Sequence, residues 1–242
     1  MGISKAKGMI IANRLLQKSA NVYVLTGDGE LQEGQFWESL ISAANDNLNE
    51  LTVIIDHNKL QSDTLVSKVS DLGDLEAKLI SFGWYVSRCD GNNLNELKEV
   101  FDEFSHVTEK PKVLIADTIK GKGVSFMEHT SIDSDVELYK YHSGAPSDDA
   151  YIRASQELIN NLNSRLRDKN LNDIELEVID RSEAPLSENS QKLVPAYAKC
   201  LLDHAKKDPS IVALDADLVL DTGLIPFLSL IHISEPTRLT SI

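Results

Sequence analysis

The feature that most constrains this fold is a repeated alternation of short apolar runs with segments of helical spacing. The runs NVYVLT, LTVIID, WYVSRC and KVLIADT are rich in β-branched and aromatic residues, and an amphipathic stretch separates each from the next. The second run is almost entirely apolar, which is typical of a strand that helices cover on both faces. The pattern therefore predicts an α/β domain with a parallel sheet flanked by helices.

The spacing of the apolar residues also predicts the helices and the domains. Helices are expected over residues 4–19, 34–44, 74–82, 94–104, 147–169 and 191–207. Residues 1–145 are predicted to form a first, incomplete α/β domain, and residues 146–190 a polar helix and an acidic linker. Residues 191–227 are predicted to start a second α/β domain, with a strand at SIVALDAD.

Charge and composition narrow the class of protein. The 242 residues carry a formal net charge of −14, which argues against nucleic acid or an anionic membrane as the main partner, because both attract basic surfaces. No apolar run approaches the roughly 18 residues of a membrane-spanning helix. The two cysteines, Cys89 and Cys200, show no metal-binding spacing, which favours a reduced, cytoplasmic protein.

The first apolar run ends in Gly27-Asp28-Gly29, and this junction has two interpretations. Asp-Gly is a frequent hairpin turn, but a hairpin needs a pairing strand directly afterwards. The residues that follow have helical spacing instead, and the next strand begins at Leu51. A strand–helix–strand crossover places the carboxyl ends of two parallel strands side by side, at the edge where open α/β sheets bind ligands.

Asn58 follows the second strand as Asp28 follows the first. A carboxylate and an amide carbonyl are hard oxygen ligands for Mg²⁺, whose remaining positions are filled by water and phosphate oxygens. Gly27 and Gly29 allow a tight turn and a close approach of the backbone to a phosphate, and the N-terminus of the next helix favours an anion. The alternative is that Asp28 and Asn58 only cap the turns in which they lie.

Three segments together resemble the transketolase family: GDGELQEGQFWESL, IIDHNKLQ and DTIKGKGVSFMEH. GDG followed on the next strand by Asn is the motif with which this family binds thiamine diphosphate. The resemblance extends from Gly2 to Ser147. The later segment KLVPAYAKCLLDHAKKDPSIVALDADLVLDTGLIPF is similar to the start of the family's second, pyrimidine-binding domain, which implies that one polypeptide carries both domains.

The resemblance implies a role for each residue of the motif. Asp28 and Asn58 would bind Mg²⁺ through their side chains, and Leu60 would bind it through its backbone carbonyl. Gly29, next to Asp28 and close to Gly27, would donate its N–H to the diphosphate. Thiamine diphosphate and Mg²⁺ are therefore the expected cofactors.

Other residues receive roles outside the motif. The resemblance places Glu33 in the network that joins the cofactor site to the subunit interface. It places His142, in YHSGAP, near the cofactor and the sugar as a catalytic residue; the alternative is a surface-loop histidine. Lys120 and Lys122 are expected either to hold phosphate or a loop, or to be solvated. His57 is expected to be structural.

The activity that the resemblance implies is transfer of a two-carbon ketol unit between sugar phosphates, as in the pentose phosphate pathway. In the family the cofactor lies between the first domain of one protomer and the second domain of its partner, so a homodimer is implied. One alternative is another thiamine diphosphate-dependent synthase, such as 1-deoxyxylulose-5-phosphate synthase. A third interpretation is a non-catalytic scaffold of the same fold.

Both ends of the sequence depart from the family pattern. The family's first strand–helix units and its catalytic glutamate are expected to lie outside this chain, so the chain alone is expected to be inactive. The segment LSLIHISEPTR, residues 228–238, is what a transposase-based sequencing adaptor encodes in this reading frame. Residues 228–242 are therefore expected to be a non-native tail; the alternative is a divergent natural strand.

Overall fold

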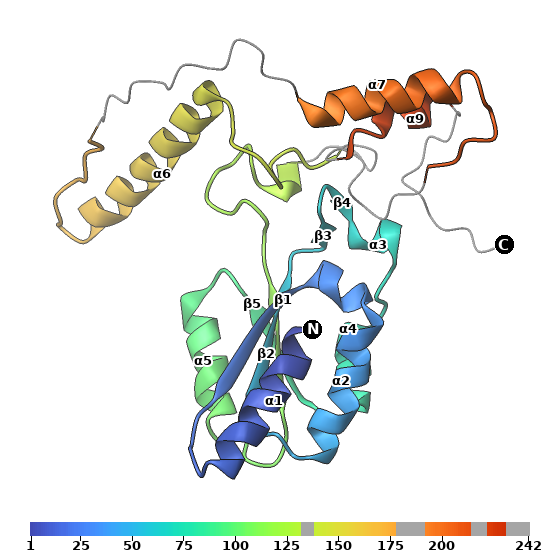
Figure 1. Cartoon of the computed structure of the whole chain (residues 1–242). Helices are drawn as coiled ribbons and strands as arrows, with labels where there is room; N and C mark the ends of the chain where they lie inside the picture. Colours follow the sequence, from blue (N-terminus) through green and yellow to red (C-terminus); the bar gives the residue numbers. More distant parts are fainter. Residues whose placement is uncertain (132–137, 178–191, 214–221, 231–242) are drawn as a thin grey trace. The chain divides into compact units, whose positions relative to one another are not determined.

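The computed structural model describes residues 1–131, 138–177, 192–213 and 222–230. The chain divides into two compact units, Met1–Tyr139 and Lys140–Ile242, and each is described here by itself (Figure 1). The first unit contains the sheet and the strand ends that the sequence singles out. The domain boundaries predicted at residues 145, 190 and 227 stay predictions.

Four strands of the first unit form a parallel sheet in the order β1-β2-β6-β5. They are β1 (Val22–Gly27), β2 (Leu51–His57), β5 (Tyr85–Asp90) and β6 (Lys112–Asp117). Each strand begins and ends within one residue of its predicted run. The predicted α/β class, with a parallel sheet flanked by helices, is confirmed.

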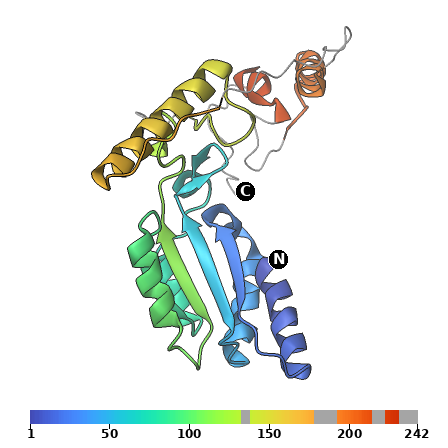
Figure 2. The same cartoon turned by 90° about the vertical axis from the view of Figure 1, so that its left-hand side faces the viewer.

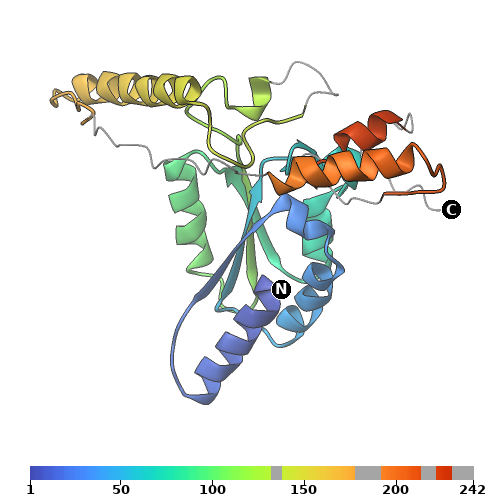
Figure 3. The ribbon, with the colours of Figure 1, turned by 45° about the horizontal axis from the view of Figure 1, so that its top comes forward.

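The helices cover the two faces of the sheet unequally. α1 (Gly2–Leu15), α2 (Gly34–Asn45) and α4 (Leu75–Ser81) pack on one face, and α5 (Leu94–Phe104) packs on the other (Figure 1, Figure 3). Right-handed crossovers explain this division. The chain advances across the sheet from β1 to β2 and then to β5, but it returns from β5 to β6, so the returning helix lies on the opposite face.

The main hydrophobic core lies between the sheet and its three helices. Ile10 of α1, Leu40 of α2 and Ile55 of β2 belong to it and are almost completely buried. A smaller core lies under α5 on the other face. Beyond that core, Tyr23 and Leu25 of β1 are 57% and 72% exposed, so α5 covers only part of its face.

α1 ends four residues before its predicted end, and the spacing of apolar residues does not indicate this end. Gln17 has a φ of 56°, in the left-handed region, and the Lys18 N–H donates to the Asn13 carbonyl at 2.8 Å. This is the Schellman arrangement that closes helices. Glycine is the usual residue at the left-handed position, and its absence here removes the sequence signal for the end of the helix.

The second unit contains the polar helix that the sequence predicts. It is α6 (Asp148–Asp168), and the Ser147 hydroxyl accepts the Ala150 N–H at its first turn, at 3.3 Å. α7 (Leu193–Ala205) and α9 (Ile225–Leu230) come later in the chain. Much of the predicted acidic linker, of the predicted strand at SIVALDAD and of the predicted non-native tail lies outside the described residues.

Candidate functional site

The carboxyl ends of β1, β2 and β6 meet at one edge of the sheet, and the chain leaves β1 and β2 there by different routes. After β1 it forms a short 3-10 helix, η1 (Asp28–Gln32), and α2 begins only beyond it. After β2 it forms a small hairpin of β3 (Leu60–Gln61) and β4 (Thr64–Leu65), followed by α3 (Val66–Val69) (Figure 2). The sequence patterns predicted neither η1 nor this hairpin.

Asp28 is a buried carboxylate at this edge, with an exposed fraction of 2%. Its Oδ2 accepts a hydrogen bond from the backbone N–H of Lys59, which follows β2. Burial raises the pKa of Asp28 above its ordinary value, and hydrogen bonds from the N–H groups of Lys59 and Gly29 act in the opposite direction. A carboxylate held in this way favours a cation beside it, because a cation offsets the cost of burying its charge.

Asn58 lies just beyond β2 and is 9% exposed. Its Oδ1 accepts the Leu60 N–H at 3.0 Å, and its Nδ2 donates to Asp56 at 3.2 Å. The Thr118 hydroxyl, just beyond β6, donates to the same aspartate. Asn58 therefore caps its turn, as the simpler interpretation predicts, and this cap also fixes an amide oxygen at the same sheet edge as Asp28.

The backbone of Gly27 does not need a glycine, whereas Gly29 lies close to a neighbouring side chain. Gly27 has φ −85° and ψ 160°, which any residue adopts, and its N–H donates to Glu30 at 3.0 Å. A Cβ at Gly27 would meet no atom within 4 Å, whereas one at Gly29 would lie 3.3 Å from Gln61 Cγ. The open space at Gly27 leaves room for a ligand to approach the backbone closely.

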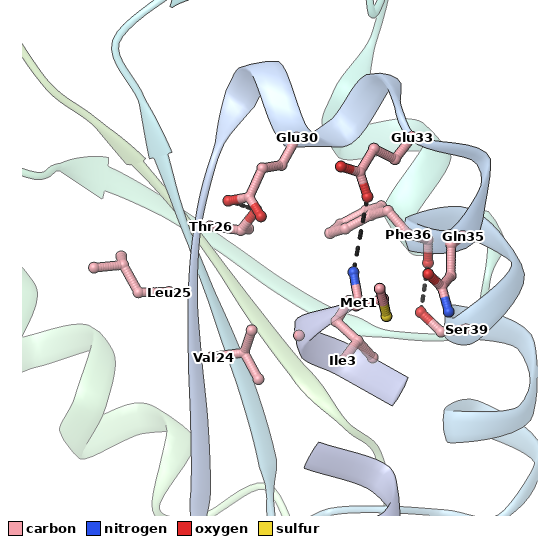
Figure 4. A pocket seen from close by; sticks show the side chains of 11 residues that line it. Met1, Ile3, Val24, Leu25, Thr26, Glu30, Glu33, Gln35, Phe36 and Ser39 are labelled. Carbon is pink, nitrogen blue, oxygen red and sulfur yellow. Dashed lines mark hydrogen bonds and ion pairs between the residues drawn. The ribbon is translucent and has the colours of Figure 1, made fainter. Parts of the chain in front are cut away.

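Glu33 is the N-cap residue of α2 and faces a small hollow beside β1 (Figure 4). Its carboxylate lies 3.7 Å from the N-terminal amine of Met1, and its side chain is 59% exposed. Within the same hollow, the Thr26 hydroxyl donates to Glu30 at 2.9 Å. The Glu33 carboxylate thus contacts the start of the chain, and its predicted role in a cofactor network stays a prediction.

Lys120 is not a solvated lysine. Its ammonium donates to the Ser62 carbonyl at 3.3 Å and lies 5.2 Å from the centre of the Tyr139 ring. Burial lowers the pKa of Lys120, and the carboxylates of Asp63 and Asp28 act in the opposite direction. Lys120 therefore places a half-buried cation in the electrostatic field of the Asp28 edge. Lys122, in contrast, is exposed and pairs with Glu128 at 3.5 Å.

Sequence reasoning missed a charged network under the same edge. Asp117, the last residue of β6, accepts two hydrogen bonds from Arg88 of β5, at 2.6 and 2.8 Å, and contacts His57 Nδ1 at 2.7 Å. Arg88 is the main cause that lowers the pKa of Asp117, and His57 acts in the same direction. This contact agrees with the predicted structural role of His57. The position of Asp117 at the end of a predicted strand could have indicated a charged group at this edge.

His142 belongs to the second unit, whereas Asp28 and Asn58 belong to the first. His142 is exposed. Its predicted role near the cofactor and the sugar stays a prediction. Leu60, the predicted third metal ligand, is the first residue of β3, and its N–H donates to Asn58 Oδ1. The structure thus gathers Asp28, Asn58 and Leu60 at one edge of one unit.

The donor set at this edge fits Mg²⁺ only in the presence of further ligands. Within the described residues, no three His, Cys, Asp or Glu side chains gather to hold a metal ion. One carboxylate, one amide oxygen and one backbone carbonyl would leave the remaining octahedral positions to phosphate oxygens and water, which is a common arrangement for Mg²⁺.

Among the residues that the structure describes, no helix is long and apolar enough to cross a membrane.

Comparisons with known proteins identify the family of this chain. Residues 1–184 match the domain family described as "Transketolase, thiamine diphosphate binding domain". Over 127 residues the chain is 37% identical to a 6-deoxy-6-sulfo-D-fructose transketolase subunit of Clostridium sp. (strain MSTE9), covering 52% of this chain and 46% of that protein. Over 157 residues it is 32% identical to an apulose-4-phosphate transketolase subunit of Phocaeicola vulgatus, covering 65% and 53%.

A solved structure shows the same fold. The transketolase of Campylobacter jejuni superposes with a TM-score of 0.57 at 22% identity, covering 65% of this chain and 24% of that chain. This likeness concerns the fold alone. The chain spans about half the length of the bacterial subunits it matches, 46% and 53% in the two cases above.

Proposed function

Because this chain belongs to the transketolase family through its thiamine diphosphate-binding domain, we propose that the Asp28 edge holds the diphosphate of that cofactor through Mg²⁺. One observation supports this proposal most directly. The buried carboxylate of Asp28 at the end of β1 and the fixed amide oxygen of Asn58 at the end of β2 lie at the same edge of the sheet. Neighbouring ends of parallel strands are where open α/β sheets bind ligands.

Each group of the edge has a separate task in this proposal. The side chains of Asp28 and Asn58 and the carbonyl of Leu60 bind the metal, and the diphosphate and water complete its coordination. The backbone at Gly27 leaves the space in which the diphosphate lies. The Gly29 N–H donates to the Asp28 carboxylate, so its predicted hydrogen bond to the diphosphate requires a change of partner. Lys120 adds a positive charge that offsets part of the negative charge of the diphosphate.

The proposed activity of the whole enzyme is transfer of a two-carbon ketol unit between sugar phosphates. Thiamine diphosphate supplies the covalent chemistry when it is bound, and the protein supplies binding, orientation and electrostatics. His142 is proposed to contact the reacting sugar. The relatives named for 6-deoxy-6-sulfofructose and apulose 4-phosphate favour phosphorylated or similarly anionic sugars as the substrate class.

The proposed assembly is a homodimer in which one polypeptide carries both domains, because residues 191–227 are similar to the start of the family's second domain. The alternative is a two-subunit enzyme, which the names of the two bacterial relatives favour. A cytoplasmic location is proposed with either assembly. Size-exclusion chromatography with light scattering, on the complete gene product with and without a candidate second subunit, distinguishes the two.

Cofactor binding is the direct test of the site. Calorimetric titration of the chain with thiamine diphosphate should give weak binding that requires Mg²⁺, and Asp28→Ala should abolish it. Asp46→Ala, at an exposed helix end, is the matched control and should bind like the parent. Absence of Mg²⁺-dependent binding by the complete gene product would favour a non-catalytic scaffold over an enzyme.

The identity of the reaction needs a second measurement. Ketol transfer from a ketose phosphate to an aldose phosphate by the complete gene product supports transketolase, whereas condensation of pyruvate with an aldose phosphate supports a 1-deoxyxylulose-5-phosphate synthase.

A further inference from the structure

The loop that carries Lys120 is closed by a reciprocal pair of hydrogen bonds with one histidine. The backbone N–H of His129 donates to the Lys120 carbonyl at 3.0 Å. In return, the backbone N–H of Lys120 donates to Nδ1 of the His129 imidazole, also at 3.0 Å. The two residues are nine positions apart, so this pair joins the two ends of the segment from Lys120 to His129, which begins with KGKG, and fixes the backbone of Lys120.

The interior of this loop is tightly folded around the same closure. The Gly123 N–H donates to Glu128 at 3.1 Å, and the Tyr139 hydroxyl donates to the Met127 carbonyl at 2.9 Å. Gly121 has a φ of 81°, and a Cβ there would lie 2.1 Å from the Met127 carbonyl oxygen. The loop therefore has little room for an alternative path while its ends stay joined.

The contact with Nδ1 requires a particular form of the imidazole. A ring nitrogen that accepts a hydrogen bond must carry a lone pair, so His129 has to be neutral with its proton on Nε2. Protonation places a second N–H on Nδ1, which then faces the N–H of Lys120. Two donors that face each other repel, the Lys120 N–H loses its acceptor, and the new Nδ1–H has none at this contact.

We propose that His129 is a pH-sensitive positioning residue, whose neutral imidazole closes this loop and so holds the Lys120 ammonium beside the Asp28 edge. The consequence for cofactor affinity rests on the proposed function, whereas the closure itself does not. His129 acts through Lys120 and need not touch the ligand. Loss of the closure frees the Lys120 backbone, and the half-buried ammonium then loses its fixed position between Ser62 and Tyr139.

The groups around His129 set the direction of the pH dependence. Burial is the largest cause that lowers the pKa of His129 below its ordinary value of 6.5, and the cations Lys59 and Lys120 act in the same direction. The Glu128 carboxylate opposes them. The loop is therefore closed at neutral and higher pH, and it opens as the pH falls below 6.5 and His129 takes up a proton.

Two variants separate this role from a merely structural one. His129→Asn keeps an oxygen that accepts the Lys120 N–H but does not titrate, and His129→Phe removes the acceptor at every pH. Hydrogen-exchange protection of the Lys120 amide is measured between about pH 8 and about pH 5.5, across the range in which histidine titrates. Protection in the parent should fall at least roughly tenfold at the acid end, which corresponds to about 1.4 kcal/mol.

The variants should differ in their dependence on pH. Protection should stay constant in His129→Asn and should be low throughout in His129→Phe. The proposal is overturned if the parent and His129→Asn show the same pH profile. Circular dichroism of each variant establishes that the sheet is folded, and protection of the β2 amides serves as the internal control.

Titration of the full chain with thiamine diphosphate and Mg²⁺ then tests the link to the cofactor. The parent should lose more affinity than His129→Asn between the two pH values. If both proteins lose affinity equally, closure of the loop by His129 does not affect cofactor binding. If no form binds at about pH 8, where the loop is closed, the proposed cofactor function fails, while the amide-exchange result still decides the role of His129.

Discussion

The carboxylate of Asp28, at the end of β1, accepts a hydrogen bond from the backbone N–H of Lys59, which follows β2. Lys59 has a φ of 67°, in the left-handed region that a lysine rarely adopts. A strained backbone and a buried charge thus meet at one contact between two strand ends. Such features persist where the surrounding structure holds them in place, and they gather at functional sites.

Asp28→Asn should stabilise the protein without its cofactor and abolish Mg²⁺-dependent binding. Burial raises the pKa of Asp28, so ionisation costs stability once the pH rises through that raised pKa, and asparagine removes this cost at neutral pH. We expect a gain of about 1 kcal/mol, or about 2–4 °C in Tm. Differential scanning calorimetry without ligand, paired with a cofactor titration, measures both effects. A less stable variant would show that the hydrogen bond to Lys59 outweighs burial.

Mg²⁺ alone should not bind measurably at millimolar concentration. The edge offers one carboxylate, one amide oxygen and one backbone carbonyl, and Mg²⁺ gives up its water reluctantly without more charged oxygens. Titration with Mg²⁺, first alone and then with thiamine diphosphate or inorganic pyrophosphate, should show binding only in the presence of a diphosphate. Tight binding of Mg²⁺ alone would mean that another carboxylate completes the site.

Gly27→Ala should weaken cofactor binding without destabilising the fold. The backbone at Gly27 suits any residue and a Cβ there meets open space, so alanine should add about 0.4–1 kcal/mol by restricting the unfolded chain. The same methyl group would occupy the space proposed for the diphosphate, and we expect at least a roughly tenfold loss of affinity, or about 1.4 kcal/mol.

Gly8→Ala is the matched control for this prediction. Gly8 lies within α1, and a Cβ there also meets no atom within 4 Å. Gly8→Ala should raise the thermal stability by a similar amount, because glycine inside a helix costs about 0.5–1 kcal/mol relative to alanine. Cofactor affinity should not change. If both variants bind like the parent, the diphosphate does not lie against Gly27.

Asp117→Asn should destabilise the first unit, and the effect should disappear in acid. Arg88, and then His57, lower the pKa of Asp117, so its charge stabilises the fold above pH 3.8 and this contribution is lost as the pH falls through the lowered pKa. The pair is partly exposed, so we expect about 1 kcal/mol at neutral pH. Thermal melts of parent and variant, recorded as the pH is lowered from neutral to below 3.8, should approach each other.

Asp102→Asn provides the comparison for Asp117→Asn. Asp102 pairs with Lys98 on the exposed face of α5, one turn apart. Exposed pairs of this kind contribute little, so this variant should melt like the parent at every pH. A difference between parent and Asp117→Asn that persists in acid would point to packing rather than charge as the cause.

Local sequence patterns predicted the repeated elements well. The strands and most of the helices follow from the spacing of apolar residues, since this spacing depends only on whether a segment is extended or helical. The same patterns placed Asp28 and Asn58 directly after neighbouring strands. They failed at Gln17, where a non-glycine residue ends α1, and at Lys59 and Ser62, whose positive φ values shape the β3–β4 hairpin.

Contacts between distant residues needed the tertiary structure. Lys120 allowed two interpretations in the sequence, and only its burial beside Tyr139 and Ser62 decided between them. Arg88 and Asp117 meet because the chain returns from β5 to β6 and places β6 between β2 and β5, an order that no local pattern contains.

The sequence by itself thus determined the class of fold, the family and the two strand ends that carry the candidate ligands. The tertiary structure alone decided which charges are buried, that Lys120 lies within the electrostatic field of Asp28, and how the Lys120 loop is closed. The physical reason is that periodicity and motifs are properties of neighbouring residues, whereas burial and electrostatics depend on which strands and loops become neighbours in the folded chain.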